Sequence, residues 1–177
     1  MKYIVLLRKI NVGTQNRIAK KALEKAFIDL QYENVSSYIN SGNIIFSSSK
    51  DKNSLKREIG KMLDELFGEP IQFLIKTKME LKKIADSIPK DWENDEEQKT
   101  DVAYLFDEVD SDNIKEQLPF KMEYVEVKYV KGALIWNLMR ENQGKSQTTK
   151  LVGQKIYQHM TVRNVNTARY LGSINDK

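Results

Sequence analysis

Residues 3–7 read Tyr3-Ile4-Val5-Leu6-Leu7, a continuous apolar run of strand length. Such a run is typical of a central strand that is covered on both faces of its sheet. After it, apolar residues recur at helical spacing from Ile18 to Leu30, and lysines lie on the opposite side, which predicts an amphipathic helix. The opening run therefore predicts a sheet that helices cover.

Further elements follow in the same part of the chain. The patterns predict strands at 35–39, 44–48 and 71–75 and a helix at 55–67. Turn-forming residues 40–43 join the first two of these strands into a hairpin, and residues 11–16 read as a loop. Gly68 and Pro70 end the helix. The order strand, helix, strand, strand, helix, strand is that of a ferredoxin-like (βαββαβ-type) unit.

The later part of the chain partly repeats this order. The patterns predict helices at 79–88, 111–118, 147–157 and 162–171, and strands at 102–106, 125–130 and 133–139. Thr161 is the predicted cap of the last helix. We therefore predict an α+β protein with two ferredoxin-like halves, in which the second half has its last strand replaced by helix.

Three segments make up the predicted organisation. Residues 1–76 form one ferredoxin-like half, and residues 77–100 form a helix and an acidic connector. Residues 101–177 form the second half with two C-terminal helices. The stretch 90–100 carries five acidic residues against two lysines, so we interpret it as exposed.

The composition excludes several classes of protein. With 40% hydrophobic and 31% charged residues, the chain is typical of a soluble globular protein. Zero cysteines exclude disulfides, thiolate nucleophiles and zinc fingers, and one histidine excludes a histidine-rich metal cluster. We expect no metal and no cofactor. The absence of a bilayer-length apolar run or a signal peptide predicts no membrane association and a cytoplasmic location.

The formal net charge of +4 hides an uneven distribution along the chain. Residues 1–75 hold 12 basic and 8 acidic side chains, and residues 76–141 hold 11 and 16. Residues 142–177 hold 6 basic and 1 acidic side chain. The end of the chain is therefore the segment most suited to an anionic ligand.

The stretch 142–175 contains no acidic residue and is rich in lysine, arginine, amides and hydroxyls. Acid-free basic segments are typical of nucleic-acid binders, whereas an ordinary solvated surface is the alternative interpretation. Within it, Gly144-Lys145-Ser146 lies between a predicted strand and a predicted helix, as in a phosphate-binding P-loop. Met139 stands where that motif needs a glycine, so a simpler anion contact or a polar loop remain the alternatives.

His159 is the one imidazole that could serve as a general base. No carboxylate or hydroxyl partner can be assigned to it from the sequence, and an exposed loop histidine is the alternative. We therefore identify no catalytic constellation, and whether the protein is an enzyme stays open.

Three motifs carry a resemblance to a bacterial family, domain of unknown function 1697, over nearly the whole chain. Residues 6–16 (LLRKINVGTQN) resemble its LLRGINVGG-N signature, and residues 37–46 (SYINSGNIIF) are similar to its TYIxSGNVVF segment. Residues 161–171 (TVRNVNTARYL) resemble its TxRNWNTVxKL segment. Lys9 and Thr14 replace glycines, and Val165 replaces a tryptophan. The resemblance implies an α+β fold with ferredoxin-like halves, and the family has no assigned function.

The polar residues of the motif segments and of the 144–146 loop form the candidate ligand site. We hypothesise that they converge on one cleft between the halves; they are Arg8, Asn11, Ser41, Asn43, Lys145, Ser146, Arg163, Asn164 and Asn166. The alternative is that the last three only cap and tie the final helix.

Three functions follow as hypotheses. The first is a non-catalytic binding module for a phosphate-bearing ligand, with nucleic acid as the expected class and a phosphorylated small molecule as the other. The second is a small enzyme acting on a nucleotide or another anionic metabolite. The third is a protein-interaction domain in which the acidic middle and the basic end meet a partner or a second copy.

Overall fold

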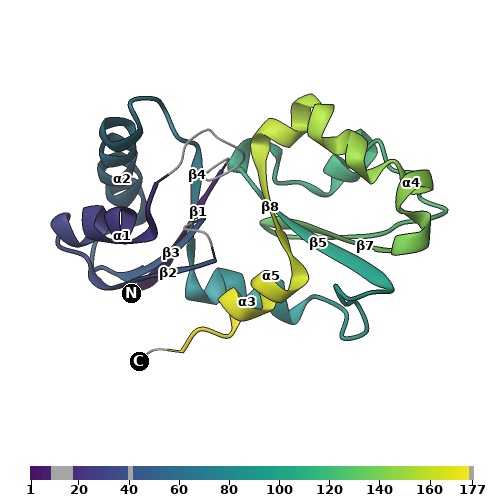
Figure 1. Cartoon of the computed structure of the whole chain (residues 1–177), viewed down its shortest axis with the longest axis horizontal. Helices are drawn as coiled ribbons and strands as arrows, with labels where there is room; N and C mark the ends of the chain where they lie inside the picture. The colour runs from purple at the N-terminus through teal and green to yellow at the C-terminus, as the bar shows by residue number, and fades with distance from the viewer. Residues whose placement is uncertain (9–17, 40–41, 176–177) are drawn as a thin grey trace. The chain divides into compact units, whose positions relative to one another are not determined.

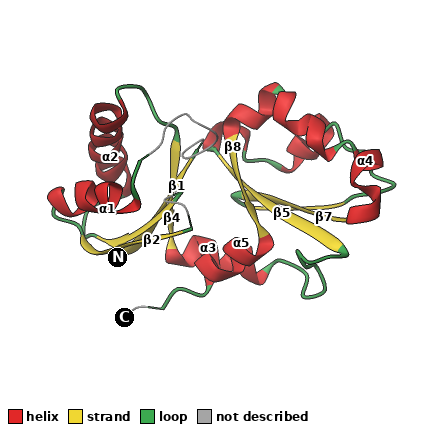
Figure 2. Cartoon of the chain, in the orientation of Figure 1, coloured by secondary structure: helices red, strands yellow, loops and turns green. Residues whose placement is uncertain are grey.

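The computed structural model describes residues 1–8, 18–39 and 42–175. They form two compact units, Met1–Lys78 and Met79–Asn175. Each unit holds one four-stranded antiparallel sheet and its own helices, so the prediction of an α+β protein is confirmed (Figures 1 and 2). The predicted loop at 11–16 and residues 40–41 of the predicted turn at 40–43 lie outside the described residues.

The first unit follows the predicted order of elements. It runs β1 (Lys2–Leu7), α1 (Lys20–Asp29), β2 (Glu33–Tyr38), β3 (Asn43–Ser47), α2 (Lys52–Phe67) and β4 (Phe73–Thr77). The sheet order is β2-β3-β1-β4, so the opening apolar run is a central strand, as predicted. Tyr3, Val5 and Leu7 face a core that α1 and α2 complete. Ile4 and Leu6, on the other face, are also fully buried.

The limits of α2 have clear local causes. Asp51 precedes the helix, and its carboxylate accepts hydrogen bonds from the main-chain N–H groups of Asn53 and Ser54. Such a side chain satisfies helix donors that have no partner within the helix. Gly68 ends the helix in the left-handed region, at φ 71°, where a glycine has no steric penalty.

The second unit holds more irregular helical turns. Its elements are α3 (Lys78–Asp86, whose first residue belongs to the first unit), β5 (Gln98–Leu105), η1 (Asp107–Val109), η2 (Asp112–Gln117), β6 (Glu126–Val130), β7 (Ala133–Met139), η3 (Arg140–Asn142), α4 (Gln143–Ser146), η4 (Thr148–Gly153), η5 (Lys155–His159), β8 (Met160–Asn164) and α5 (Val165–Gly172). The sheet order is β6-β7-β5-β8, and Ala103, Leu105, Trp136 and Met160 lie in a core on one face.

The prediction that helix replaces the last strand of the second half was wrong. Residues Met160–Asn164 form β8, which pairs antiparallel with β5 from Met160↔Leu105 to Asn164↔Asp101. The β-branched Thr161 and Val162 favour this extended backbone. The final helix begins at Val165, and its cap is Asn164 rather than Thr161, which is buried in the strand.

Two other expectations for the second unit also need correction. A continuous helix at 147–157 is not formed; η4 and η5 are short 3-10 turns that bury Leu151 and Ile156. The connector at 90–100 is not wholly exposed, because Trp92 and Thr100 are buried and β5 begins at Gln98. Its residues Asp91, Asp95, Glu96 and Glu97 are exposed as expected.

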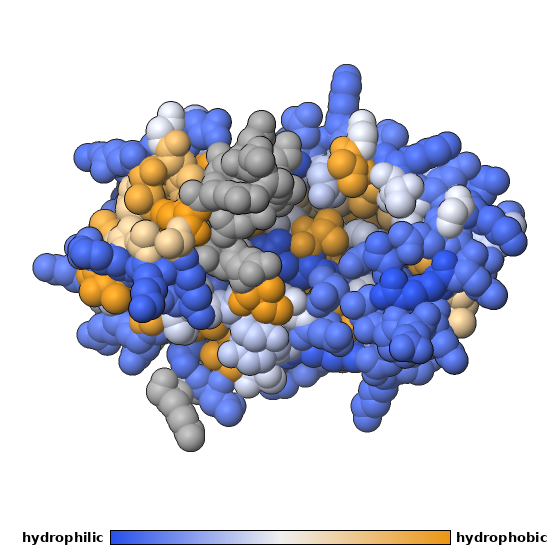
Figure 3. Space-filling model, in the orientation of Figure 1, coloured by the Kyte–Doolittle hydropathy of each residue, from blue (hydrophilic) through white to orange (hydrophobic). Residues whose placement is uncertain are grey.

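One face of the molecule is shown by hydropathy in Figure 3. On the face shown in Figure 3, hydrophobic residues gather over α1 and α2, whereas the surface around α4 is mostly hydrophilic. None of the helices in the described ranges has the length and hydrophobicity needed to cross a bilayer.

Candidate functional site

Arg8 and Asn43 lie at the same end of the first sheet, on neighbouring strands. Arg8 follows β1, and its main-chain N–H and its Nη1 donate to the main-chain oxygen of Gln72 (2.9 Å) and to Gln72 Oε1 (3.2 Å). Asn43 begins β3 opposite Leu6, and its Nδ2 donates to the main-chain oxygen of Tyr38 at 2.8 Å. Both side chains are buried, at 8% and 2% exposure. The other candidates of this unit, Asn11 and Ser41, lie outside the described residues.

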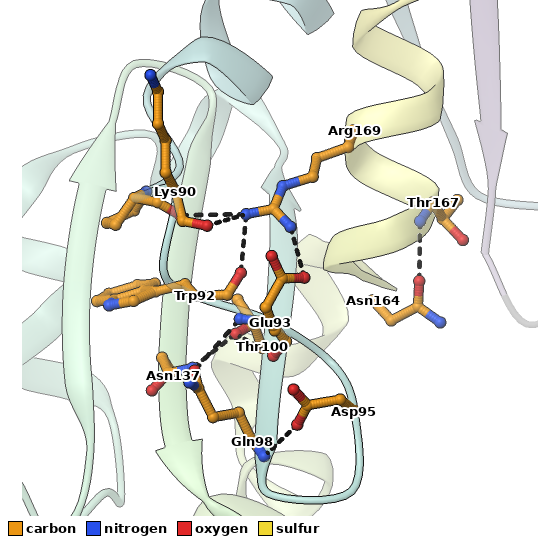
Figure 4. Close-up of polar contacts among 11 residues, drawn as sticks. Lys90, Trp92, Glu93, Asp95, Gln98, Thr100, Asn137, Asn164, Thr167 and Arg169 are labelled. Carbon is orange, nitrogen blue, oxygen red and sulfur yellow. Dashed lines mark hydrogen bonds and ion pairs between the residues drawn. The ribbon is translucent and has the colours of Figure 1, made fainter.

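Arg163, Asn164 and Asn166 lie together at the passage from β8 to α5. Nη1 of Arg163 donates to Oγ1 of Thr161 and to the main-chain oxygen of Val162, both at 2.9 Å. Burial lowers the pKa of Arg163, and the charge interactions with Tyr104 and Tyr157 oppose this shift only in part. Asn164 is the N-cap of α5: its Oδ1 accepts a hydrogen bond from the main-chain N–H of Thr167 at 2.9 Å (Figure 4). Asn166 is exposed on the first turn of the helix.

Arg169 was not among the predicted site residues, and it makes the largest set of polar contacts in Figure 4. Its Nη1 contacts Oε2 of Glu93 at 2.8 Å. Its Nη2 donates to the main-chain oxygens of Pro89 (3.1 Å), Lys90 (3.4 Å) and Trp92 (2.8 Å). The contacts tie α5 to segment 89–93. In the sequence, only the position of Arg169 inside the motif at 161–171 singled it out. No residue near it in the sequence indicated that its partners lie at 89–93.

A second set of hydrogen-bonded polar side chains lies on strands β5 and β7 of the second sheet. Nδ2 of Asn137 donates to Oε1 of Gln98 at 2.8 Å and to Oγ1 of Thr100 at 2.7 Å. The hydroxyl of Thr100 in turn donates to the main-chain oxygen of Glu93 at 2.7 Å (Figure 4). Because buried polar groups are costly when unpaired, these bonds indicate a structural role for the group.

Lys145 and Ser146, the residues of the P-loop-like string, differ in accessibility. Ser146 is fully buried, and its hydroxyl donates to the main-chain oxygen of Gln143 at 2.8 Å and bonds to the hydroxyl of Thr148 at 3.0 Å. Lys145 is exposed, with its ammonium 5.9 Å from the centre of the Tyr124 ring. Helix α4 has only four residues, so its N-terminus has no appreciable macrodipole.

The exposed polar side chains of segment 143–159 share one property: all are neutral or basic. They are Lys145, Thr149, Lys150, Gln154, Lys155, Gln158 and His159. We call these seven residues the donor surface. Its helical turns cover the core of the second unit through Leu151 and Ile156, which leaves the polar side chains facing solvent.

Acidic residues border one end of the donor surface. The main-chain N–H of Phe106 donates to the main-chain oxygen of His159 at 3.0 Å, and η1, which follows Phe106, carries Asp107 and Glu108. Within the described ranges no group of three or more metal-ligating side chains is present. His159 is exposed at this acidic end.

The structure thus brings the predicted residues into three places. Arg8 and Asn43 share one end of the first sheet, and Arg163, Asn164 and Asn166 share the β8–α5 passage. Lys145 and Ser146 lie elsewhere in the second unit, since Figure 1 shows α4 well apart from α5. A single cleft that joins all of these segments stays a prediction.

Comparisons with known proteins identify relatives of unknown function. A family model described as "Protein of unknown function (DUF1697)" matches residues 1–136. A solved structure, that of the conserved bacterial protein SP0830 from Streptococcus pneumoniae, is similar with a TM-score of 0.84 and 25% sequence identity. The similarity covers 97% of this chain and 96% of that chain. No curated protein matches the chain.

Proposed function

The chain belongs to the DUF1697 family of proteins of unknown function, and on this premise we propose that it is a non-catalytic binding module for a phosphate-bearing ligand, with nucleic acid as the class. The observation that carries the proposal is the donor surface. Its three lysines and four neutral polar residues are exposed in one segment without any carboxylate. Phosphate oxygens accept hydrogen bonds and attract cations, so a surface of this chemistry suits a phosphate backbone.

The geometry limits the expected footprint to a few phosphates. Lys145, Lys150 and Lys155 are the cations of the donor surface, and the acidic turn η1 borders its His159 end. Ser146 is not expected to contact a phosphate, because its hydroxyl is buried and donates to the main-chain oxygen of Gln143. Three phosphate contacts on a single strand give a slope of about −2 for log K against log salt concentration.

The test is a fluorescence anisotropy titration with short single-stranded RNA and DNA at several salt concentrations. The variant carries Lys145→Gln, Lys150→Gln and Lys155→Gln, which should remove most of the affinity and flatten the salt slope. The matched control carries Lys21→Gln, Lys56→Gln and Lys83→Gln, which removes the same charge from exposed positions outside the donor surface. Equal loss in both variants would show that net charge alone governs binding.

A phosphorylated small molecule is the other ligand of the same chemistry. Stabilisation by nucleoside phosphates in a thermal-shift assay, with no oligonucleotide binding, would favour it; a ligand at a hundredfold its Kd adds about 2.7 kcal/mol. Absence of both responses would refute the proposal.

Two further proposals concern fold and location. Both units are ferredoxin-like, which is supported by the matching strand orders β2-β3-β1-β4 and β6-β7-β5-β8. We also propose that the protein acts in the cytoplasm, as the sequence analysis predicts.

A further inference from the structure

Tyr124 is an aromatic side chain at the border of the donor surface. Its ring is half-buried, and the exposed Lys145 holds its ammonium 5.9 Å from the ring centre. The ammonium lies over a face of the ring, as in a cation–π contact. One face of Tyr124 is therefore directed at a residue of the donor surface, where a bound ligand would meet it.

Main-chain hydrogen bonds fix Tyr124 next to segment 143–159. The N–H of Lys121 donates to the main-chain oxygen of Ser146, and the N–H of Tyr124 donates to that of Lys121, both at 2.9 Å. The ring also packs against the core of the second unit, and Ser146 is fully buried. None of these contacts uses the side chain of Lys145, so the ring keeps its place when that side chain moves. An aromatic surface that is ordered before binding loses little entropy when a ligand binds.

The contact between Lys145 and the ring is weak enough to be exchanged. Its 5.9 Å is close to the limit of about 6 Å for such contacts, which contribute little at exposed sites. The lysine stem is flexible, and its ammonium is a compact point charge that suits a phosphate oxygen. When the ammonium moves to a phosphate, the ring face that it covered becomes available to a base.

Glu123 is the acidic neighbour of this ring. A hydrogen bond with Glu123 raises the pKa of the Tyr124 phenol, which places the carboxylate at the hydroxyl end of the ring. An acid repels phosphate oxygens, so the phosphates are expected on the Lys145 side. A base needs no opposite charge in order to stack. The acid therefore limits where the backbone lies without opposing a base over the ring.

We propose that Tyr124 stacks on one base of a single-stranded nucleic acid whose phosphates contact the lysines of the donor surface. This inference rests on the proposed function and adds a contact with a base, which the lysines do not provide. Bases in a duplex stack on one another, whereas those of a single strand offer free faces to an aromatic side chain. Every base has such a face, so the contact selects a single strand and not a sequence.

The experiment compares two DNA strands of equal length in fluorescence anisotropy titrations of the full chain. One strand carries bases, and in the other tetrahydrofuran abasic units replace the nucleotides. The wild type should bind the strand with bases about tenfold more tightly, which corresponds to one stacked base. Tyr124→Leu keeps an apolar side chain against the core but should lose this difference. Tyr124→Phe, which retains a ring, should keep it.

Tyr170→Leu is the matched control for the loss of a ring. Tyr170 is 41% exposed on α5, which Figure 1 shows well apart from α4, so this variant should bind both strands as the wild type does. Equal wild-type affinity for the two strands, or a preference for bases that Tyr124→Leu retains, overturns the base contact. Salt-dependent binding of both strands would then still support the phosphate contacts. Binding of neither strand overturns both proposals.

Photocrosslinking tests the same contact without any substitution. A strand that carries 5-iodouracil is irradiated in complex with the wild type, and mass spectrometry locates the adduct. The adduct should lie on Tyr124, because the stacked base is in direct contact with its ring. Adducts confined to other residues would contradict the proposal even if Tyr124→Leu failed to fold.

Discussion

The guanidinium of Arg169 shows how one side chain can hold a segment that is distant in sequence. It donates to three main-chain oxygens of residues 89–92 and pairs with Glu93. A planar fork with several donors can serve these acceptors together, whereas an ammonium presents a single centre.

Replacing Arg169 by lysine should therefore lower the free energy of unfolding by about 2 kcal/mol, since hydrogen bonds to charged groups contribute on this scale. Urea unfolding checks the value. Lys82→Ala is the control: it breaks an exposed pair with Asp86 and should cost less than about 0.5 kcal/mol. If Arg169→Lys lowers the free energy of unfolding by no more than Lys82→Ala does, the contacts of Arg169 with residues 89–93 contribute little to stability.

Tyr104 presents the opposite case, a hydroxyl without a partner. Its oxygen is buried and makes no hydrogen bond within the described residues, and burial raises the pKa of the phenol. Tyr104→Phe should leave stability unchanged or raise it by up to about 1 kcal/mol. Tyr3→Phe removes a hydrogen bond to the main-chain oxygen of Lys50 and should lower the free energy of unfolding by about 1 kcal/mol. Thermal denaturation of both variants measures the difference. Destabilisation by Tyr104→Phe would reveal a partner outside the described residues.

The sequence pointed to several site residues but not to their contacts. Arg163 and Asn164 stood out because they lie in a motif, yet one bonds along its own strand and the other caps a helix. Asn164 carried a usable signal, because asparagine is a preferred N-cap. The partners of Arg169 lie more than 70 residues away in sequence, so no local pattern could have indicated them.

At the scale of elements, α3 and α5 approach closely at Gly172. A Cβ built there would lie 2.3 Å from Cβ of Ala85 and 3.2 Å from the main-chain oxygen of Leu81. Gly172→Ala should therefore force the helices apart and cost about 1–3 kcal/mol. Gly153→Ala is the control, because nothing lies within 4 Å of its added Cβ. Thermal denaturation of Gly172→Ala and Gly153→Ala measures the difference. Equal melting temperatures of the two variants would contradict the close approach of the helices.

The cap of α2 should make stability depend on pH. Hydrogen bonds from the main chain and the hydroxyl of Ser54 lower the pKa of Asp51. The charged cap therefore stabilises the folded state above the unfolded pKa of about 3.9, and this contribution is lost as the pH falls through the folded pKa. Asp51→Asn keeps an acceptor oxygen without the charge. In urea unfolding from neutral pH downward, the difference between wild type and variant should shrink toward zero; a constant difference would contradict this origin.

Strand β8 is the element that the sequence failed to predict. The sequence analysis predicted a helix over residues 162–171, with Thr161 as its cap. The strand is five residues long, and its pairing with β5 joins residues about 60 positions apart. Such pairing overrides local preference and cannot be derived from periodicity. The regular elements of the first unit were predicted because each has its own local pattern and clear end signals, such as Gly68.

At the scale of the whole molecule, each unit has its own core on one face of its sheet. We expect a substitution in one core to destabilise the sheet of its own unit more than the sheet of the other unit. Leu63→Ala should speed hydrogen exchange in β1 and β3, and Leu138→Ala should do so in β5 and β7, each costing about 2–5 kcal/mol. Uniform acceleration across both sheets by either variant would show one cooperative unit instead.

The shared strand order has a consequence for synthesis on the ribosome. In each sheet the first strand made lies in the interior, and the last strand made completes one side of it. The first sheet can close once Thr77 has emerged, but β5 waits for β8 at residues 160–164. During that interval one edge of β5 offers unpaired main-chain groups to other nascent chains. Strand β1 passes through the same interval before β4 is made, because Tyr3 pairs with Thr77, 74 positions later, whereas Asp101 pairs with Asn164, 63 positions later. Both units of the newborn protein therefore have a stage at which protection by a chaperone would matter.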